Sequence, residues 1–209
     1  MPKVAYSDAD RERVRTALIT TALDLMARQG VQHTTVEQVY KAVGISRTFF
    51  YTFFPSKEDL IVETLYFQQP KLLAYAQHLM EDPALDWREG VAQFLTTCCY
   101  GERSGIATLT VEEQQLIFHR LSPESYRIFR AKQARLFDDL LSCFGVQPSP
   151  ERTSLFTNLC LAVIIFRHAI PDTLPLFVPE AADQTTQIQI HAIVDCLEAF
   201  RRQDQTASL

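Results

Sequence analysis

The spacing of apolar residues is the feature of this chain that most constrains its fold. Apolar side chains recur every three or four positions along most of the sequence, and no clean run alternates apolar with polar residues. A spacing of three to four places apolar side chains along one side of an α-helix, whereas a half-buried strand requires strict alternation. The chain is therefore predicted to be all-α.

Capping residues and helix-breaking residues divide this pattern into separate helices. Ser56, Asp86, Thr110 and Ser122 each stand where an N-cap is expected, because their side-chain oxygens can accept the free N–H groups of a first helical turn. Pro70 is expected to kink or split the helix that it interrupts. The predicted helices span residues 8–29, 35–43, 47–53, 86–101, 111–121, 123–144, 150–169 and 185–202, with one more that starts at Lys57 and a loop from Pro171 to Asp183.

The first quarter of the chain has the pattern of a helix-turn-helix. Thr34 and Glu37 have the spacing of a capping box that would start the second helix. Residues 44–46 leave only a tight turn before the third helix, which Ser46 is placed to cap. In such a unit one helix enters the major groove of DNA while the helix before it braces the contact.

Charge is distributed unevenly along the chain. The formal net charge is −5, which by itself does not favour a nucleic acid as partner. Residues 11–57, however, hold seven basic and three acidic residues, whereas residues 58–209 hold twelve basic and twenty acidic residues. Residues 11–57 are called the basic head below, and residues 58–209 the acidic body. This asymmetry is expected of a chain with a phosphate-binding module. Double-stranded DNA is therefore the predicted partner of the first quarter.

Polar side chains of the predicted helix-turn-helix are the candidates for DNA contact. An arginine on the third helix can read guanine edges, and a threonine can contact a thymine methyl group or a phosphate. Tyr51 could instead belong to the core, because phenylalanines surround it, and the hydroxyl residues could be helix caps only. The predicted DNA-binding residues are Thr34, Thr35, Ser46, Arg47, Thr48, Tyr51, Thr52 and Lys57.

Several residue types recur in register over positions 11–60. They are Arg11-x-x-Val14-x-x-Ala17-x-x-x-x-Ala22-x-x-Leu25, Gly30, Thr34-Thr35-Val36-x-x-Val39, Ala42-x-Gly44-Ile45-Ser46 and Phe50-Tyr51-x-x-Phe54-Pro55-Ser56-Lys57-Glu58-x-Leu60. This stretch resembles the N-terminal signature of the TetR family of repressors. The resemblance implies a homodimeric repressor that reads a pseudo-palindromic operator and whose C-terminal domain binds a small-molecule effector and releases DNA.

The match to this family is not uniform along the motif. Ser46, Tyr51 and Lys57 fall on matching positions. At Tyr40, Thr48 and Phe49 the family usually has alanine, glycine and threonine. The base-reading surface is therefore expected to be bulkier than the family pattern.

The rest of the chain is predicted to form a second helical module. We expect residues 1–56 to be the DNA-binding domain and residues 57–209 to bind the effector and to dimerise. The apolar helices 150–169 and 185–202 fit either a core or a paired-helix dimer interface. Most of the apolar side chains of these helices are expected to belong to the core. The candidate effector-pocket residues are Phe94, Cys98, Phe118, Phe129 and Phe166.

Two other classes of function remain open. An all-α enzyme would use His119 or Cys99, although no nucleophile, base and orienting residue stand at a recognisable spacing and no metal-ligand cluster is apparent. An architectural DNA-binding protein would have a packed second module and no effector site. We predict no catalytic residue, no metal and no cofactor.

The sequence also carries an expectation about the compartment. No stretch reaches the roughly 20 apolar residues of a membrane span, and the first ten residues have no apolar leader. The five cysteines are odd in number and lack C-x-x-C spacing, which is typical of reduced thiols. We therefore expect a cytoplasmic protein with no membrane partner and no structural disulfide.

Overall fold

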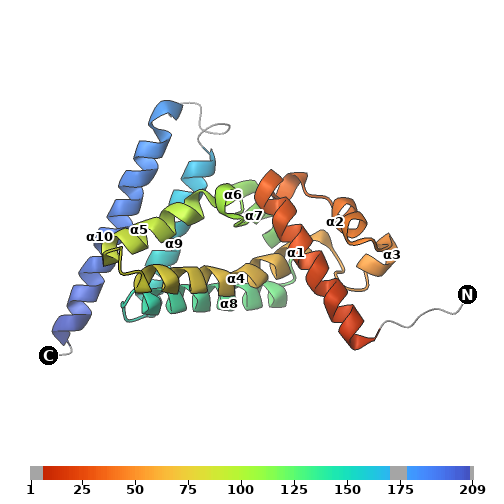
Figure 1. The fold of residues 1–209 in the computed structure, drawn as a ribbon, viewed down its shortest axis with the longest axis horizontal. Helices are drawn as coiled ribbons and strands as arrows, with labels where there is room; N and C mark the ends of the chain where they lie inside the picture. The colour runs from red at the N-terminus through yellow and green to blue at the C-terminus, as the bar shows by residue number, and fades with distance from the viewer. Residues whose placement is uncertain (1–6, 170–177, 208–209) are drawn as a thin grey trace, which may run out of the picture.

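The computed structural model describes residues 7–169 and 178–207, and within them every regular element is a helix (Figure 1). The all-α prediction is confirmed. The helices are α1 (Asp8–His33), α2 (Val36–Val43), α3 (Arg47–Phe50), α4 (Lys57–Glu81), α5 (Trp87–Cys99), α6 (Gly101–Ser104), α7 (Val111–Arg120), α8 (Pro123–Cys143), α9 (Pro150–Ala169) and α10 (Ala182–Ala207), with a 3-10 turn at Pro179–Ala181.

Helices α1, α2 and α3 form one end of the molecule (Figure 1). Leu18 and Ala22 of α1 pack with Val39 of α2 and Phe50 of α3 in a core from which water is excluded. The N-terminal part of α4 belongs to the same core through Leu60 and its neighbours. This apolar core therefore crosses the domain boundary expected at residues 56 and 57, which stays a prediction.

Helix α4 joins the two ends of the molecule. Its N-cap is Ser56, whose hydroxyl accepts the Asp59 N–H at 3.1 Å, as expected. Pro70 lies inside α4 and does not split it. Packing holds both halves of the helix in place, because Leu65 is buried in the first core and Ala76 in the second.

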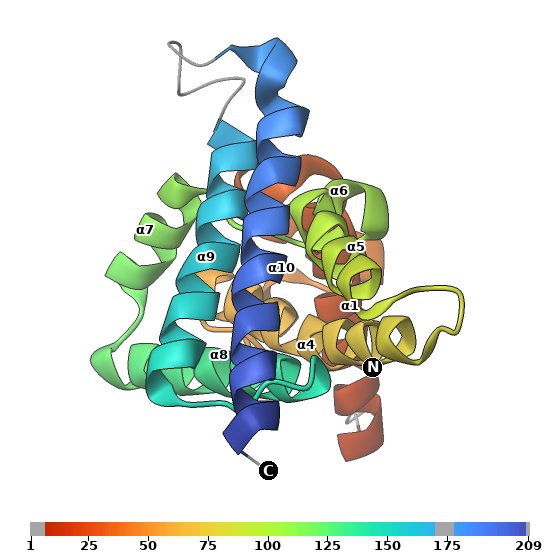
Figure 2. The same cartoon turned by 90° about the vertical axis from the view of Figure 1, so that its left-hand side faces the viewer.

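The second core lies among α4, α5, α8, α9 and α10. Phe94, Phe144 and Phe156 meet there, with ring centroids 5.5 Å apart for Phe94 and Phe144 and 6.2 Å for Phe144 and Phe156. Helices α9 and α10 lie side by side at the end of the molecule opposite α3 (Figure 2). The outer sides of both helices remain open to solvent.

Several helix boundaries differ from the prediction. The helix predicted over residues 86–101 ends at Cys99, and α6 follows as a separate turn closed by Gly105, which has a φ of 67°. Helix α3 ends at Phe50 rather than at residue 53. Within the loop expected from Pro171 to Asp183, residues 170–177 lie outside the described residues, and α10 already begins at Ala182. Ends shift because the last turns depend on packing more than on local sequence.

Candidate DNA interface and effector cavity

The turn between α2 and α3 is fixed by backbone conformation and backbone hydrogen bonds. Gly44 has a φ of 77°, a left-handed conformation that glycine adopts without strain, and its N–H donates to the carbonyls of Tyr40 and Lys41. Ser46 caps α3 by accepting the Phe49 N–H at 3.2 Å. Phe50 and Phe54 are 0% and 2% exposed. These contacts fix the direction of a helix of only four residues.

The outward side of this unit carries most of the predicted contact residues. Tyr51 is 41% exposed, so the alternative that it belongs to the core is not what the structure shows. The Arg47 guanidinium lies 5.8 Å from the centre of the Tyr51 ring, so the two side chains occupy one patch. The exposed members of the predicted set are Thr35, Ser46, Arg47, Thr48, Tyr51 and Thr52.

Thr34 does not occupy the place that the sequence predicted. It is 1% exposed, and its hydroxyl donates to the Gly30 carbonyl at 2.8 Å, so it is not accessible to a phosphate. The capping box of α2 is formed instead by Thr35 and Gln38, with 2.7 Å between the Thr35 nitrogen and the Gln38 Oε1 atom. Both residue pairs have the same spacing in the sequence, and packing against α1 selects the second.

Lys57 is half-buried between α1 and α4. Its Nζ atom donates to the Val31 carbonyl at 2.8 Å. Burial lowers the pKa of Lys57, although the nearby Glu113 and Glu58 carboxylates oppose this shift. In this conformation the ammonium group ties the end of α1 to the start of α4, and it is less available to DNA than the residues of α3.

A cavity of about 570 Å³ lies among α4, α5, α7, α8 and α9. Four of the five predicted pocket residues line it, namely Phe94, Cys98, Phe118 and Phe129. Phe166 does not line it. The lining residues of α9 include Thr157, Leu161 and Ile164, and continuing this three-to-four spacing leads past position 166.

Burial keeps two of the thiols that line the cavity neutral. Cys98, Cys99 and Cys160 line its wall. Burial raises the pKa of Cys98 to about 12 and that of Cys160 well above its ordinary value. A thiol with a raised pKa is a poor nucleophile at neutral pH. Cys98 and Cys160 therefore present polarisable apolar surface to the cavity.

Amide side chains that the sequence analysis did not select also belong to this wall. Gln68 is buried, and its amide both donates to the Ala107 carbonyl at 2.9 Å and accepts the Ala107 N–H at 3.1 Å. Gln69 and Gln114 line the cavity nearby. Glutamine at a helical position resembles a solvated surface residue in a sequence, so no signal distinguished them.

Helix α7 connects the cavity wall to the helix-turn-helix. Glu113 is 4% exposed, and its carboxylate accepts the Gln32 N–H of α1 at 2.8 Å. Arg120, at the other end of α7, forms an ion pair of 2.6 Å with Glu58, which is 7% exposed. Because Phe118 of α7 also lines the cavity, one helix contacts both sites. Figure 1 shows α6 and α7 beside the C-terminal end of α1.

The residues considered for an enzyme do not form a joint site. Cys99 lines the cavity, whereas His119 is exposed and is absent from its wall. Within residues 7–169 and 178–207, no group of three or more histidine, cysteine, aspartate or glutamate side chains is placed to hold a metal ion. In the same residues no helix combines the length and apolarity required to cross a membrane.

The first quarter of the chain is similar in sequence to known bacterial regulatory proteins. Residues 18–64 match the family model described as bacterial regulatory proteins, tetR family. The HTH-type transcriptional regulator YuxN of Bacillus subtilis is 41% identical over 142 residues, which are 66% of this chain and 48% of that protein. TcmR of Streptomyces glaucescens is 46% identical over 48 residues, 23% of this chain and 21% of that protein. The chain thus spans about half or less of these relatives.

Solved structures share the fold over most of the chain. The reduced form of Escherichia coli NemR has a TM-score of 0.54 at 12% identity, covering 90% of this chain and 96% of its own. A tetR-family transcriptional regulator from Pectobacterium atrosepticum has a TM-score of 0.53 at 17% identity, covering 92% and 94%. A transcriptional regulator from Saccharomonospora viridis, solved in complex with choline, has a TM-score of 0.50 at 15% identity, covering 88% and 96%.

Proposed function

Because this chain belongs to the TetR family of helix-turn-helix transcriptional regulators, we propose that it is a repressor that a small-molecule effector releases from its operator. The observation that carries the proposal is the exposed polar side of α3, with Arg47 and Tyr51 held over the fully buried Phe50. A short helix with a fixed core side and a free polar side is the element that reads a major groove.

The contact residues take different roles in this proposal. Arg47 donates to the O6 and N7 atoms of a guanine, which is the commonest specific contact in the major groove. Tyr51, Thr35 and Ser46 contact phosphate oxygens, and the free N–H groups at the start of α2 support them. Thr48 and Thr52 extend the same surface. Thr34 is not part of this set, because its hydroxyl is buried and bonded within the chain.

The open sides of α9 and α10 supply the proposed dimer interface. Leu155 of α9 is 42% exposed, and Ile188 of α10 is 62% exposed. Two copies that pair these helices by a two-fold axis bury this apolar surface. Their α3 helices then reach half-sites one helical turn apart, roughly 34 Å, on a pseudo-palindromic operator.

Release by an effector follows from the place of α7 in this proposal. A ligand in the cavity contacts Phe118 and Gln114 of α7, and Glu113 of the same helix holds the end of α1. A ligand that binds better when α7 is displaced shifts the protein toward a state that cannot span both half-sites. The regulator from Saccharomonospora viridis that was solved with choline shows that a protein of this fold can hold a small molecule.

A DNA-binding titration tests the proposal. The full-length chain is titrated against labelled DNA that flanks its own coding region, at two salt concentrations, and fluorescence anisotropy is recorded. We expect a specific, salt-dependent complex. We expect Arg47→Ala to weaken it by about 1–3 kcal/mol, because a bidentate contact to guanine is lost.

The control for Arg47→Ala is Arg127→Ala. Arg127 is exposed on α8, outside the helix-turn-helix, and is paired with Glu124 at 2.7 Å. This variant should bind as the unmodified chain does. The proposal fails if no specific complex forms, or if both variants bind with the unmodified affinity.

A further inference from the structure

The described residues of the cavity wall carry charge of one sign only. Among its described lining residues, Arg130 is the one with a formal charge, and no aspartate or glutamate contributes. The other polar side chains of the wall are amides, hydroxyls and thiols, such as Gln68, Gln69, Gln133 and Asn158. The cavity is therefore electrostatically favourable to an anion and unfavourable to a cation.

Arg130 is not used elsewhere in the part of the chain that the structure describes. It is exposed on α8 while it lines the cavity, which places it at the mouth, and it has no hydrogen-bond or ion-pair partner among the described residues. Its neighbours on α8 differ in this respect. Arg127 pairs with Glu124, and the Lys132 ammonium lies 3.7 Å from the centre of the Tyr66 ring. A free guanidinium at a concave apolar site can hold a carboxylate through two parallel hydrogen bonds.

The interior of the cavity suits an apolar body. Phe118 and Phe129 stack edge to face with their ring centroids 5.5 Å apart, and Phe94 lines the same space. The thiol of Cys98 stays protonated, because burial raises its pKa to about 12. The Gln69 Nε2 group is buried and has no hydrogen-bond partner in the described chain, so it leaves a donor for an oxygen of a ligand. This N–H group can donate to a carboxylate oxygen but cannot accept a hydrogen bond from an ammonium group.

We infer that the cavity binds an apolar carboxylic acid, whose carboxylate pairs with Arg130 at the mouth and whose hydrocarbon body lies among the phenylalanine rings. This inference rests on the proposed function, since it names the chemical class of the effector. A volume of about 570 Å³ lies within the range of ligand pockets and can hold a molecule with an aromatic ring and a chain of several methylene groups.

Matched ligands of one hydrocarbon skeleton test the charge preference. The probes are ω-phenylalkanoic acids of graded chain length, with the primary amide and the primary amine of the same skeleton. Binding to the full-length chain is measured by calorimetry and by the shift in melting temperature. The acid of the best-fitting length should bind at least about 10-fold more tightly than its amide, because a charged hydrogen-bond pair is lost in the amide. The amine should give no binding.

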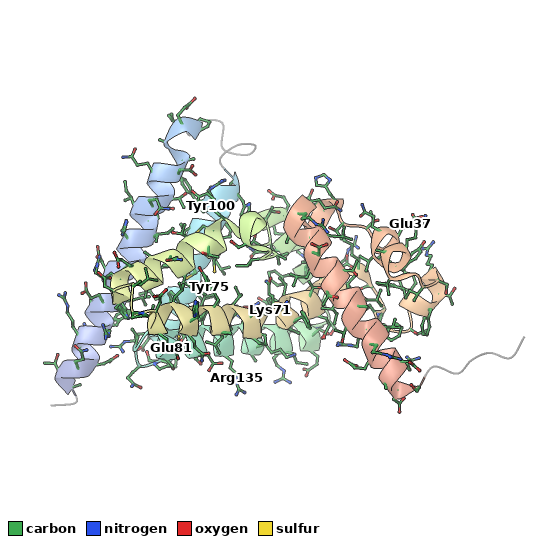
Figure 3. The ribbon with its side chains drawn as sticks, in the orientation of Figure 1. Glu37, Lys71, Tyr75, Glu81, Tyr100 and Arg135 are labelled. Atoms are coloured by element: carbon green, nitrogen blue, oxygen red, sulfur yellow. The ribbon has the colours of Figure 1, made fainter. Side chains whose placement is uncertain are left out.

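A second pair of variants locates the carboxylate. Arg130→Met should abolish the preference for the acid over the amide. Arg135→Met is the control, because Arg135 lies on the same helix, is exposed, does not line the cavity and points away from the helices (Figure 3). It should leave the preference unchanged. The inference is overturned if the amide or amine binds as tightly as the acid, if no acid of the series binds, or if Arg130→Met retains the preference.

These measurements contain no DNA, so their outcome is independent of the operator titration. If the acids bind through Arg130 and no specific DNA complex forms, the repressor proposal fails and the ligand class stands. If the chain binds its operator and none of the acids binds, the ligand class fails alone. If both stand, adding the best acid to the DNA complex should lower its anisotropy, and Arg130→Met should remove this response.

Discussion

Phe50, the last residue of α3, and Tyr51, its C-cap, point in different directions because successive helical positions are about 100° apart. Phe50 is fully buried and holds the helix against α1 and α2, whereas Tyr51 is 41% exposed and faces outward. The Tyr51 ring packs edge to face on Phe50, with centroids 5.3 Å apart, so the buried residue also orients the exposed one. Stability and the proposed DNA contact thus depend on different side chains, and substitutions can separate them.

Phe50→Ala should mainly lower the stability of the fold, whereas Tyr51→Phe should mainly weaken binding to the operator. Phe50→Ala removes a fully buried ring and should lower the free energy of unfolding by about 3–5 kcal/mol in urea titrations. Tyr51→Phe removes one exposed hydroxyl and should change it by less than about 0.5 kcal/mol. The same variant should weaken the operator complex by about 1 kcal/mol or more, because a phosphate contact is lost. Unchanged operator binding by Tyr51→Phe would remove Tyr51 from the proposed contact set.

At the scale of elements, α7 links the wall of the cavity to the helix-turn-helix end of the molecule. The Glu113 carboxylate accepts two N–H groups, from Gln32 at 2.8 Å and from Thr110 at 2.9 Å, and is buried while doing so. A buried carboxylate that loses either donor is costly. Displacement of α7 and loosening of the end of α1 are therefore coupled events.

Glu113→Gln should weaken the contact between α7 and the end of α1 while keeping a side chain of the same size at this position. The Gln32 N–H and the Thr110 N–H bind different oxygens of Glu113, and glutamine replaces one of these oxygens by an NH2 group, which cannot accept a hydrogen bond. We expect faster amide hydrogen exchange at Gln32 and its neighbours and a loss of about 1–3 kcal/mol in unfolding free energy. Glu112→Gln, at the exposed neighbouring position, is the control and should change neither quantity. Equal exchange in both variants would contradict the coupling.

At the scale of the whole molecule, the basic surface and the exposed apolar surface lie at opposite ends, and this separation determines how two copies could bind one duplex. The basic head lies at one end, and the exposed apolar residues of α9 and α10 lie at the other (Figures 1 and 2). Pairing through the far end would leave both heads free to reach one duplex. Residues 58–209 hold twenty acidic and twelve basic residues, and this acidic excess opposes DNA binding by the body and favours contact through the head alone.

Ile188→Glu should disrupt the proposed dimer. Ile188 is 62% exposed in the single chain, and a charged side chain there would be buried without a partner on dimerisation. Light scattering after size-exclusion chromatography should show a shift to monomer, with a weaker operator complex, because each half-site is then bound separately. Ile128→Glu alters a residue of α8 that is 42% exposed and should leave the dimer intact. A dimer that persists with Ile188→Glu would place the interface elsewhere.

The features that could be predicted from the sequence are those decided within a few residues. The helices and the caps at Ser46, Ser56, Asp86, Thr110 and Ser122 follow from local hydrogen bonding and apolar spacing, and the structure confirms them. The helix-turn-helix follows in the same way, because the Gly44 turn and the apolar sides of its helices are local.

Only the tertiary structure decided those features for which the local sequence allows more than one arrangement. The predicted capping box of Thr34 and Glu37 is wrong, because packing against α1 buries Thr34 and the box is formed by Thr35 and Gln38. The Glu113 contact with Gln32 joins residues 81 positions apart, and Arg130 reaches the cavity only through the packing of α8. Such contacts depend on how whole helices cross, and that arrangement is set by the sum of many burial energies rather than by any short segment.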